Sequence, residues 1–314
     1  DILAEQDPEY SGGPAMKVVW LGDKHQIRPV SDIAYVKPGG DYNVTLTKQW
    51  RNPNELQVPI GELTAMIDGA PLKPLTANKR FIRGKDIVKE YKASESKNKV
   101  ILAYTNKCVE ELNCKAQGYK KPKDQDILFS PTTKQQYKFL GFVKDPDYVD
   151  TPFSGEIHKD SKYKTLEYLI KTKSCKFAEV EDGDGNILTI AFTFGHYQSK
   201  IKIEELKSKA AKSNSDIETK HRGYKAAAWA KNNAKTNLGR ARSKAWRDFL
   251  SYDECVICLD FNHATTVHKS QGSTFEEVFL DTEDIYKCAN INLGQCLELM
   301  LVGISRAQKY VTTN

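Results

Sequence analysis

The sequence has no long apolar run, no even set of cysteines and no serine- or zinc-hydrolase signature. Its 314 residues contain no stretch close to the roughly 20 apolar residues that a membrane-spanning helix needs. The seven cysteines are scattered and odd in number, which argues against the disulfide framework of a secreted protein. The motifs GxSxG and HExxH are both absent. These absences predict a protein of the reducing cytoplasm with no membrane contact.

Two local patterns resemble metal sites only weakly. Cys255 and Cys258 have CxxC spacing, but an offset of three on a strand puts the two thiols on opposite faces, and no second pair follows. Residues 182–186 resemble the start of a calcium loop, yet the Glu that should end such a loop is missing. A hairpin turn explains residues 182–186 better. We therefore predict no metal ligands in this sequence.

Positive charge is present in excess, with a formal net charge of +6 and a pI of about 8.7. Thirteen Lys or Arg stand against four Asp or Glu between Lys202 and Arg247. A solvated helix face is the common explanation of such a run. The alternative is a nucleic-acid surface, which Trp229 and Trp246 favour because aromatic rings can stack on bases.

Strands alternate with helices at both ends of the sequence. The predicted strands are residues 16–21, 42–46, 100–103, 255–261, 278–280 and 309–312. The predicted helices are residues 56–67, a helix from Val109 onward, and residues 293–301. This alternation predicts an α/β fold with a parallel sheet and with functional groups at the carboxyl ends of its strands.

The middle of the sequence differs in composition from the two ends. Residues 128–200 are rich in Tyr, Phe, Thr and Gly in short alternating runs, which predicts a small β-barrel or curled sheet. Residues 201–250 contain almost no Gly or Pro and many Ala and Lys, which predicts a helical hairpin. We expect the hairpin to break near residues 213–216.

One polar loop, VHKSQGSTF at residues 267–275, lies between two apolar runs. It is full of hydrogen-bond donors, and donors grouped at the end of a strand typically hold an anion or a nucleotide. An ordinary polar connection is the alternative. The loop is therefore a candidate anion site.

Five motifs together resemble a known family. GDKHQIRPV, QWRNPN, AYTNK, TTVHKSQGSTF and VGISRA occur in the order and approximate spacing of the later motifs of superfamily 1 helicases. The sequence is most similar to the 5′-to-3′ branch, which holds the RecD-like enzymes and the Dda-like enzymes of T-even phages. GDKHQIRPV and the insertion between AYTNK and VHKSQG carry this likeness, which covers nearly the whole chain.

The resemblance implies RecA-like parallel sheets with two insertions. Residues 1–50 would be the end of a first RecA-like domain. Residues 51–127 and 255–314 would form a complete second domain. An SH3-like β-barrel, the hook, would occupy residues 128–200, and a helical hairpin, the tower, residues 201–254. In this family the two insertions brace the element that separates DNA strands.

The resemblance also implies an ATP site between the two RecA-like domains. Its nucleotide-binding residues would be Asp23, Gln26, Arg51, Gln271, Gly272 and Arg306. Gln26 would sense the γ-phosphate and the attacking water, because its amide can both donate and accept. Arg51 and Arg306 would neutralise transition-state charge with planar guanidinium groups. A surface salt bridge is the alternative for each arginine.

A second set of residues is implied at single-stranded DNA. These residues are Pro29, Thr105, Asn106, Lys107, Thr266 and His268. Thr105 and Asn106 can offer a hydroxyl, an amide and backbone N–H groups to a phosphate, and Thr266 and His268 can do the same. A structural histidine is the alternative for His268. The partners implied are single-stranded and fork DNA and a single-strand-binding protein, for a monomer in the cytoplasm of a bacterium or phage-infected cell.

The sequence departs from the family at several points. GxxxxGK[ST], the acidic pair of the Walker B strand and the strand-separating pin are all absent, and Thr274 stands where many relatives have Glu. The sequence opens at Asp1, without Met, on a loop that leads into a buried strand. We therefore expect a fragment whose magnesium ligands lie in a missing N-terminal part.

The sequence thus predicts a fragment of an ATP-dependent 5′-to-3′ DNA helicase and single-strand translocase. A non-catalytic single-strand-binding module derived from a helicase is the first alternative. A helicase-like nuclease subunit is the second, although the sequence shows no clustered carboxylates for metal-dependent cleavage.

Overall fold

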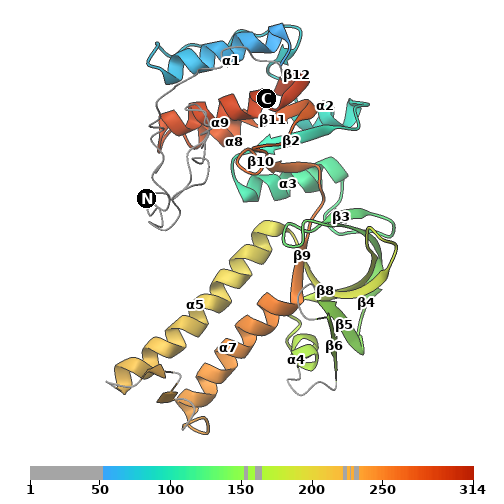
Figure 1. Cartoon of the computed structure of the whole chain (residues 1–314), viewed down its shortest axis with the longest axis vertical. Coiled ribbons are helices and arrows are strands. Elements are labelled where there is room, and N and C mark those ends of the chain that lie inside the picture. Colours follow the sequence, from blue (N-terminus) through green and yellow to red (C-terminus); the bar gives the residue numbers. More distant parts are fainter. Residues whose placement is uncertain (1–51, 152–154, 160–164, 222–224, 227, 230–232) are drawn as a thin grey trace, which may run out of the picture.

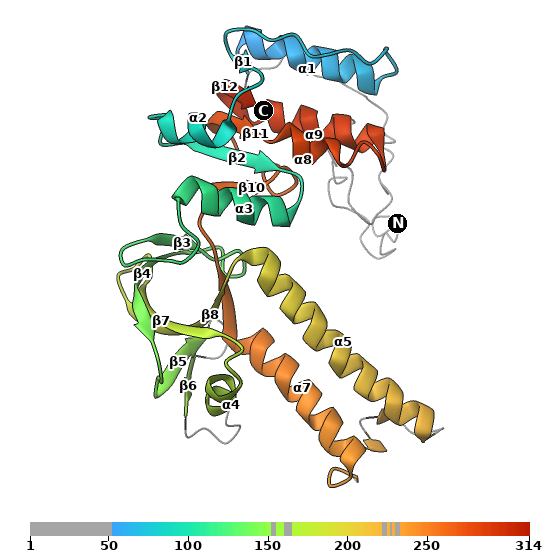
Figure 2. The ribbon, with the colours of Figure 1, turned by 180° about the vertical axis from the view of Figure 1, so that it is seen from behind.

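The computed structural model describes residues 52–151, 155–159, 165–221, 225–226, 228–229 and 233–314. Figure 1 shows these residues in two parts, a sheet between helices above and a curled sheet with two long helices below. The view from behind shows the same two parts (Figure 2). Within the described ranges, no helix is both long enough and apolar enough to cross a membrane.

The upper sheet is parallel throughout the described chain. Its order is β1-β12-β11-β2-β10, formed by Phe81–Ile82, Ala307–Thr313, Phe275–Leu280, Lys99–Ala103 and Ala264–Thr266. Every pair of neighbours runs parallel. Parallel strands need crossover connections, and the helices of those connections bury both faces of the sheet. The predicted α/β class with a parallel sheet is confirmed.

Helices cover both faces of this sheet. One face carries α1 (Asn54–Ile67), α8 (Thr282–Tyr286) and α9 (Leu293–Ser305), and the other carries α2 (Ile87–Ala93) and α3 (Asn106–Gln117). The alternation of side chains along β2 sorts Val100 and Leu102 into the first core, and Ile101 and Ala103 into the second. The helices predicted at residues 56–67, from Val109 and at 293–301 are confirmed, although α9 runs on to Ser305.

The lower sheet contains a ring of strands. Its members are β3 (Ile127–Phe129), β4 (Gln136–Val143), β7 (Lys176–Glu181), β8 (Ile187–Phe194) and β9 (Val256–Leu259). Consecutive members of that order are hydrogen-bonded, and a bridge between Phe129 and Asp260 joins the last strand back to the first. The ring encloses an apolar core that includes Phe139 and Phe192. A closed or curled sheet is therefore present where one was predicted, while its SH3-like class stays a prediction.

Smaller elements attach to this ring. A hairpin of β5 (Tyr148–Thr151) and β6 (Gly155–His158) joins β8 through one residue pair, and α4 (Thr165–Thr172) lies beside it. The turn between β7 and β8 is held by Asp182, whose carboxylate accepts the backbone N–H groups of Asp184 and Asn186 at 2.9 Å each. Residues 182–186 are a hairpin turn, as predicted.

The predicted helical hairpin is formed by α5 (His196–Lys220) and α7 (Asn237–Cys255). The break predicted near residues 213–216 is wrong, because α5 continues through them. Asn214 faces the partner helix, where its side-chain oxygen accepts from Arg242 Nε at 2.8 Å and from Trp246 Nε1 at 3.1 Å. These tertiary contacts offset the weak helix propensity of the Ser and Asn residues there.

The prediction for residues 255–261 is also corrected. This apolar run was expected in the parallel sheet, but its strand, β9, pairs with β8 in the lower ring. The strand that completes the parallel sheet is instead β10, which pairs with β2. An apolar run identifies a buried strand but does not identify the sheet in which it lies. The three-residue β10, Ala-Thr-Thr, is too short and polar to stand out in the sequence.

Candidate functional site

The turn between β2 and α3 holds the first group of predicted site residues. Thr105 is the N-cap of α3, and its hydroxyl oxygen accepts from Cys108 N at 3.2 Å. The backbone N–H and hydroxyl of Thr105 also donate to Asp284, at 2.7 Å and 3.1 Å. Thr105 thus differs from the expectation, because the donors assigned to a DNA phosphate are bound by a carboxylate of the same chain.

Asn106 and Lys107 follow Thr105 in the first turn of α3. Asn106 is partly exposed and Lys107 is exposed. The first N–H groups of a helix have no partner within the helix, and they give its N-terminus a partial positive charge. An amide and an ammonium group at this position can therefore approach a phosphate from solvent.

Thr266 and His268 lie at the end of β10, beside this turn. Thr266 is buried and pairs with Ala103, the last residue of β2. The ring of His268 packs against Tyr104, with centroids 6.1 Å apart. Burial lowers the pKa of His268, and its Nε2 is buried with no hydrogen-bond partner in the described part of the chain. The structure thus brings Asn106, Thr266 and His268 to one edge of the sheet.

The loop of residues 267–274 then crosses from one edge of the sheet to the other. It begins at the carboxyl end of β10 and ends where β11 begins, at Phe275. Gln271 and Gly272 are exposed along this path, and Gly272 has a φ of +84°. That conformation favours glycine, and a Cβ there would meet no atom within 4 Å. The loop therefore reaches both edges of the sheet, whereas functional groups were expected at the carboxyl edge alone.

Arg306 lies at the amino edge, where the loop ends. It is 5% exposed and caps the C-terminus of α9 just before β12. Its guanidinium donates to Ser273 O at 3.5 Å and to Ser305 Oγ at 3.2 Å. Its carbonyl accepts from Phe275 N at 2.9 Å. The two nucleotide-side predictions, Gln271-Gly272 and Arg306, thus come from segments that meet at this edge.

Asn52 is a residue of this edge that the sequence did not single out. It is buried, and its side-chain amide donates to Ala307 O at 2.7 Å and to Ser305 O at 3.3 Å. Asn52 therefore binds the backbone on both sides of Arg306. The predicted residues Asp23, Gln26, Pro29 and Arg51 lie outside the described residues.

The joint between the upper and lower parts is also hydrogen-bonded. Glu110 of α3 accepts the N–H groups of Tyr197 at 3.1 Å and Gln198 at 3.3 Å, in the first turn of α5. Burial raises the pKa of Glu110. A Cβ on Gly195, which has a φ of +97°, would lie 2.7 Å from the Glu110 carboxyl. The start of the hairpin is therefore fixed by a residue of the upper part.

His263 links the two segments of chain that connect the upper part to the lower part. His263 lies just before β10, and its Nε2 is 2.7 Å from Gln117 Oε1, at the end of α3. Its Nδ1 is 3.1 Å from the Tyr91 hydroxyl of α2. Burial lowers the pKa of His263. The start and the end of the lower part thus lie side by side.

The helical hairpin carries a dense group of exposed cations. Among the described residues of the hairpin, the exposed basic ones are Lys200, Lys207, Lys209, Lys212, Lys220, Lys225, Lys235, Arg240, Lys244 and Arg247. Its two tryptophans contact other residues of the hairpin. Trp246 donates to Asn214, and Trp229 stacks on His221 with centroids 4.3 Å apart. The case for base stacking on the hairpin is therefore weakened.

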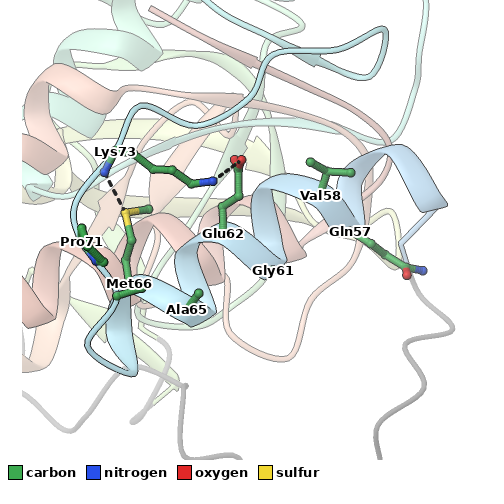
Figure 3. Close-up of a pocket in the computed structure, with 9 residues that line it drawn as sticks. Gln57, Val58, Gly61, Glu62, Ala65, Met66, Pro71 and Lys73 are labelled. Carbon is green, nitrogen blue, oxygen red and sulfur yellow. Dashed lines mark hydrogen bonds and ion pairs between the residues drawn. The ribbon is translucent and has the colours of Figure 1, made fainter.

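A hollow lies along the outer side of α1 (Figure 3). The Lys73 ammonium and the Glu62 carboxylate meet over it at 3.0 Å, as the dashed line shows. None of its lining residues belongs to either functional edge. Among the described residues, no three His, Cys, Asp or Glu side chains form a group that could hold a metal ion.

One family model matches part of the chain. Residues 261–312 match the UvrD-like helicase C-terminal domain. This range begins just before β10 and contains the crossing loop and Arg306. No curated protein matches the chain.

The chain is also similar to two solved helicase structures. One is the Pif1 helicase from Bacteroides in complex with ADP-AlF3 and ssDNA, at 11% identity and a TM-score of 0.34, with 86% of this chain and 51% of that chain covered. The other is the Pif1 helicase from Candida albicans, at 11% identity and a TM-score of 0.26, with 85% and 55% covered. The chain spans about half the length of each.

Proposed function

We propose that this chain is part of an ATP-dependent DNA helicase that moves along single-stranded DNA in the 5′-to-3′ direction. The match of residues 261–312 to a helicase C-terminal domain supports a helicase origin. The observation that carries the proposal is the crossing loop, because one segment of eight residues joins the edge that holds His268 to the edge that holds Arg306.

In this proposal the carboxyl edge binds DNA. Asn106, Lys107, Thr266 and His268 contact successive phosphates or bases of a single strand, together with Pro29. Phosphate contacts from fixed side chains set the register of a nucleic acid on a protein. The packing of His268 against Tyr104 supports this role, because it holds the imidazole in one orientation.

The amino edge binds the γ-phosphate end of ATP. Arg306, with Arg51, neutralises the charge that develops during phosphoryl transfer, while Gln26 orients the attacking water. Asp23, Gln271 and Gly272 complete the nucleotide contacts. Asn52 supports this role for Arg306, since it fixes the carbonyls on both sides of that residue.

The crossing loop couples the two edges. A shift of Gln271 and Gly272 toward a bound nucleotide pulls on a loop whose other end carries His268. A change at the ATP end is thereby transmitted to the DNA end. In this proposal the magnesium ligands expected with ATP come from another part of the protein.

The lower part braces the DNA fork in this proposal, with the ring as hook and the helical hairpin as tower. Glu110 supports this view because it fixes the start of α5 to the upper part. The partners are then single-stranded and fork DNA, with a single-strand-binding protein as a further partner of a monomeric enzyme.

A strand-displacement assay tests the proposal on the protein encoded by the complete reading frame. With ATP and magnesium present, a duplex with a 5′ single-stranded tail should be unwound, and a 3′-tailed duplex should be left nearly intact. Equal unwinding of both substrates would remove the 5′-to-3′ assignment. DNA binding without ATP hydrolysis would instead favour the non-catalytic module, an alternative supported by the absence of GxxxxGK[ST] from this sequence.

A further inference from the structure

Asp284 is a buried carboxylate beside the candidate DNA edge. It lies in α8, just after β11, and is 1% exposed. Its Oδ2 accepts the backbone N–H groups of Tyr104 at 2.9 Å and Thr105 at 2.7 Å. The Thr105 hydroxyl is 3.1 Å from both of its oxygens. One carboxylate thus binds three donors of the turn that precedes α3.

Asp284 is itself held firmly. Its backbone N–H donates to Asp281 Oδ1 at 3.0 Å, and Asp281 also accepts from Asn314 Nδ2 at 3.0 Å. The Lys287 ammonium donates to Asp284 Oδ1 at 2.9 Å, and this hydrogen bond raises the pKa of Lys287. The carboxylate therefore has both a fixed backbone and a charged partner.

These contacts occupy the place where an external anion would be expected. Backbone N–H groups at the start of a helix attract phosphates because they are unpaired and partly positive. The N–H of Thr105, the N-cap of α3, and that of Tyr104 before it already have a carboxylate partner. Exchanging that partner for a DNA phosphate would leave a buried charge without its hydrogen bonds, which is strongly unfavourable. The internal carboxylate is thus expected to stay in place when DNA binds.

We propose that Asp284 is a positioning residue of the DNA-binding edge. It fixes the turn between β2 and α3 from inside, so that a bound strand meets the outward side chains of Asn106 and Lys107 and not the Thr105 amide. This inference rests on the proposed DNA-binding function. It adds a residue that would touch no DNA and would act through the turn that it holds.

Two substitutions at Asp284 and one matched control test the proposal. The probe is a fluorescein-labelled oligothymidylate, titrated by fluorescence anisotropy at two salt concentrations. Asp284→Ala leaves three donors without an acceptor, and we expect about tenfold weaker binding. Asp284→Asn should bind within about threefold of the unaltered protein, because an amide of the same shape can accept the two N–H groups and donate to the Thr105 oxygen. Glu283→Ala removes an exposed carboxylate from the same helix and should change little.

Three results would overturn the proposal. Tighter binding by both Asp284 variants would mean that the carboxylate competes with DNA for the turn. Equal affinity of Asp284→Ala and the unaltered protein would remove the positioning role. Failure of the unaltered protein to bind the oligonucleotide would overturn the proposed DNA-binding function itself, and this inference with it.

A measurement on the unaltered protein covers the case in which Asp284→Ala does not fold. On addition of the oligothymidylate, the amide signals of Asn106 and Lys107 should shift in a ¹⁵N NMR spectrum. The amides of Tyr104 and Thr105 should keep their positions and stay protected from hydrogen exchange, because Asp284 remains bound to them. A large shift of the Thr105 amide together with loss of its protection would contradict the proposal.

Discussion

The crossing loop and the helical hairpin carry their polar groups in opposite ways. The hairpin has many exposed cations on long side chains, and its tryptophans pack inside the hairpin. The loop and the neighbouring turn have few cations, but they are held by contacts such as His268 with Tyr104, and Arg306 of the α9 cap with Ser273 O. Exposed cations attract a polyanion diffusely and are screened by salt, whereas fixed donors set its register. We therefore expect the loop and turn, and not the more highly charged hairpin, to set the register of a bound strand.

The largest expected effect tests the amino edge of the sheet. Arg306→Ala should lower the rate of DNA-stimulated ATP hydrolysis by roughly 10³ in the complete enzyme, as is typical when an arginine that neutralises transition-state charge is lost. Single-strand affinity should stay within about threefold, because the residues proposed to bind DNA lie at the opposite edge. Steady-state hydrolysis and anisotropy titrations measure the two quantities.

Arg240→Ala, an exposed arginine of the hairpin, is the matched control and should change neither quantity. Arg306 is buried, so thermal unfolding of each variant should be recorded alongside. Hydrolysis by Arg306→Ala within tenfold of the unaltered rate would exclude the assigned role.

The next prediction compares variants of the loop and turn with variants of the hairpin. His268→Ala combined with Asn106→Ala should weaken oligothymidylate binding about tenfold at moderate salt, because fixed phosphate contacts are lost. Lys225, Lys235 and Lys244 changed together to Glu should act mainly at low salt, where long-range attraction is unscreened. Affinity should fall with salt at a log–log slope of about −0.7 per phosphate contact.

One set of binding results would show that the hairpin, and not the loop, binds DNA. If the hairpin charge reversals abolish binding at both salt concentrations and the loop double variant binds normally, the hairpin is the DNA site. A circular dichroism spectrum of each variant controls for loss of helix.

The smallest effect concerns the joint between the two regions. Glu110→Ala removes the acceptor of the Tyr197 and Gln198 N–H groups and should destabilise the chain by about 1 kcal/mol, the usual cost of losing a helix cap. Urea unfolding measures the change, with the exposed neighbour Glu111→Ala as control. Equal stability of the two variants would show that Glu110 does not hold the hairpin.

Local patterns predicted much of the upper part. β2, β11 and β12, together with α1, α3 and α9, follow from apolar periods and polar boundaries that each occupy a few neighbouring residues. The same reasoning misplaced residues 255–261, because pairing of β9 with β8 depends on chain that is distant in sequence. It also missed Asp284 and Asn52, whose partners lie 180 and 255 positions away. A polar residue reveals such a role only when the fold brings its partner close.

The candidate site was predicted as a set of residues but not as an arrangement. The resemblance named both Arg306 and His268, and sequence order alone could not tell that they would lie at opposite edges of a sheet, at the two ends of one loop. It assigned Thr105 to DNA because threonine before a helix offers donors. Here the Thr105 hydroxyl oxygen accepts from Cys108 N as the helix cap, and the hydroxyl and backbone N–H donate to a buried carboxylate.

The bridge between Phe129 and Asp260 bears on how the upper sheet closes. β10 pairs with β2 across the whole insertion, and the entropy lost in closing a loop grows with the logarithm of its length. Phe129 and Asp260 exchange backbone hydrogen bonds of 2.8 Å and 3.0 Å. Once these bonds join the two ends of the insertion, residues 104–128 and 261–263 are what separates β2 from β10. The entropy lost when β10 pairs with β2 is then that of closing a loop much shorter than the insertion.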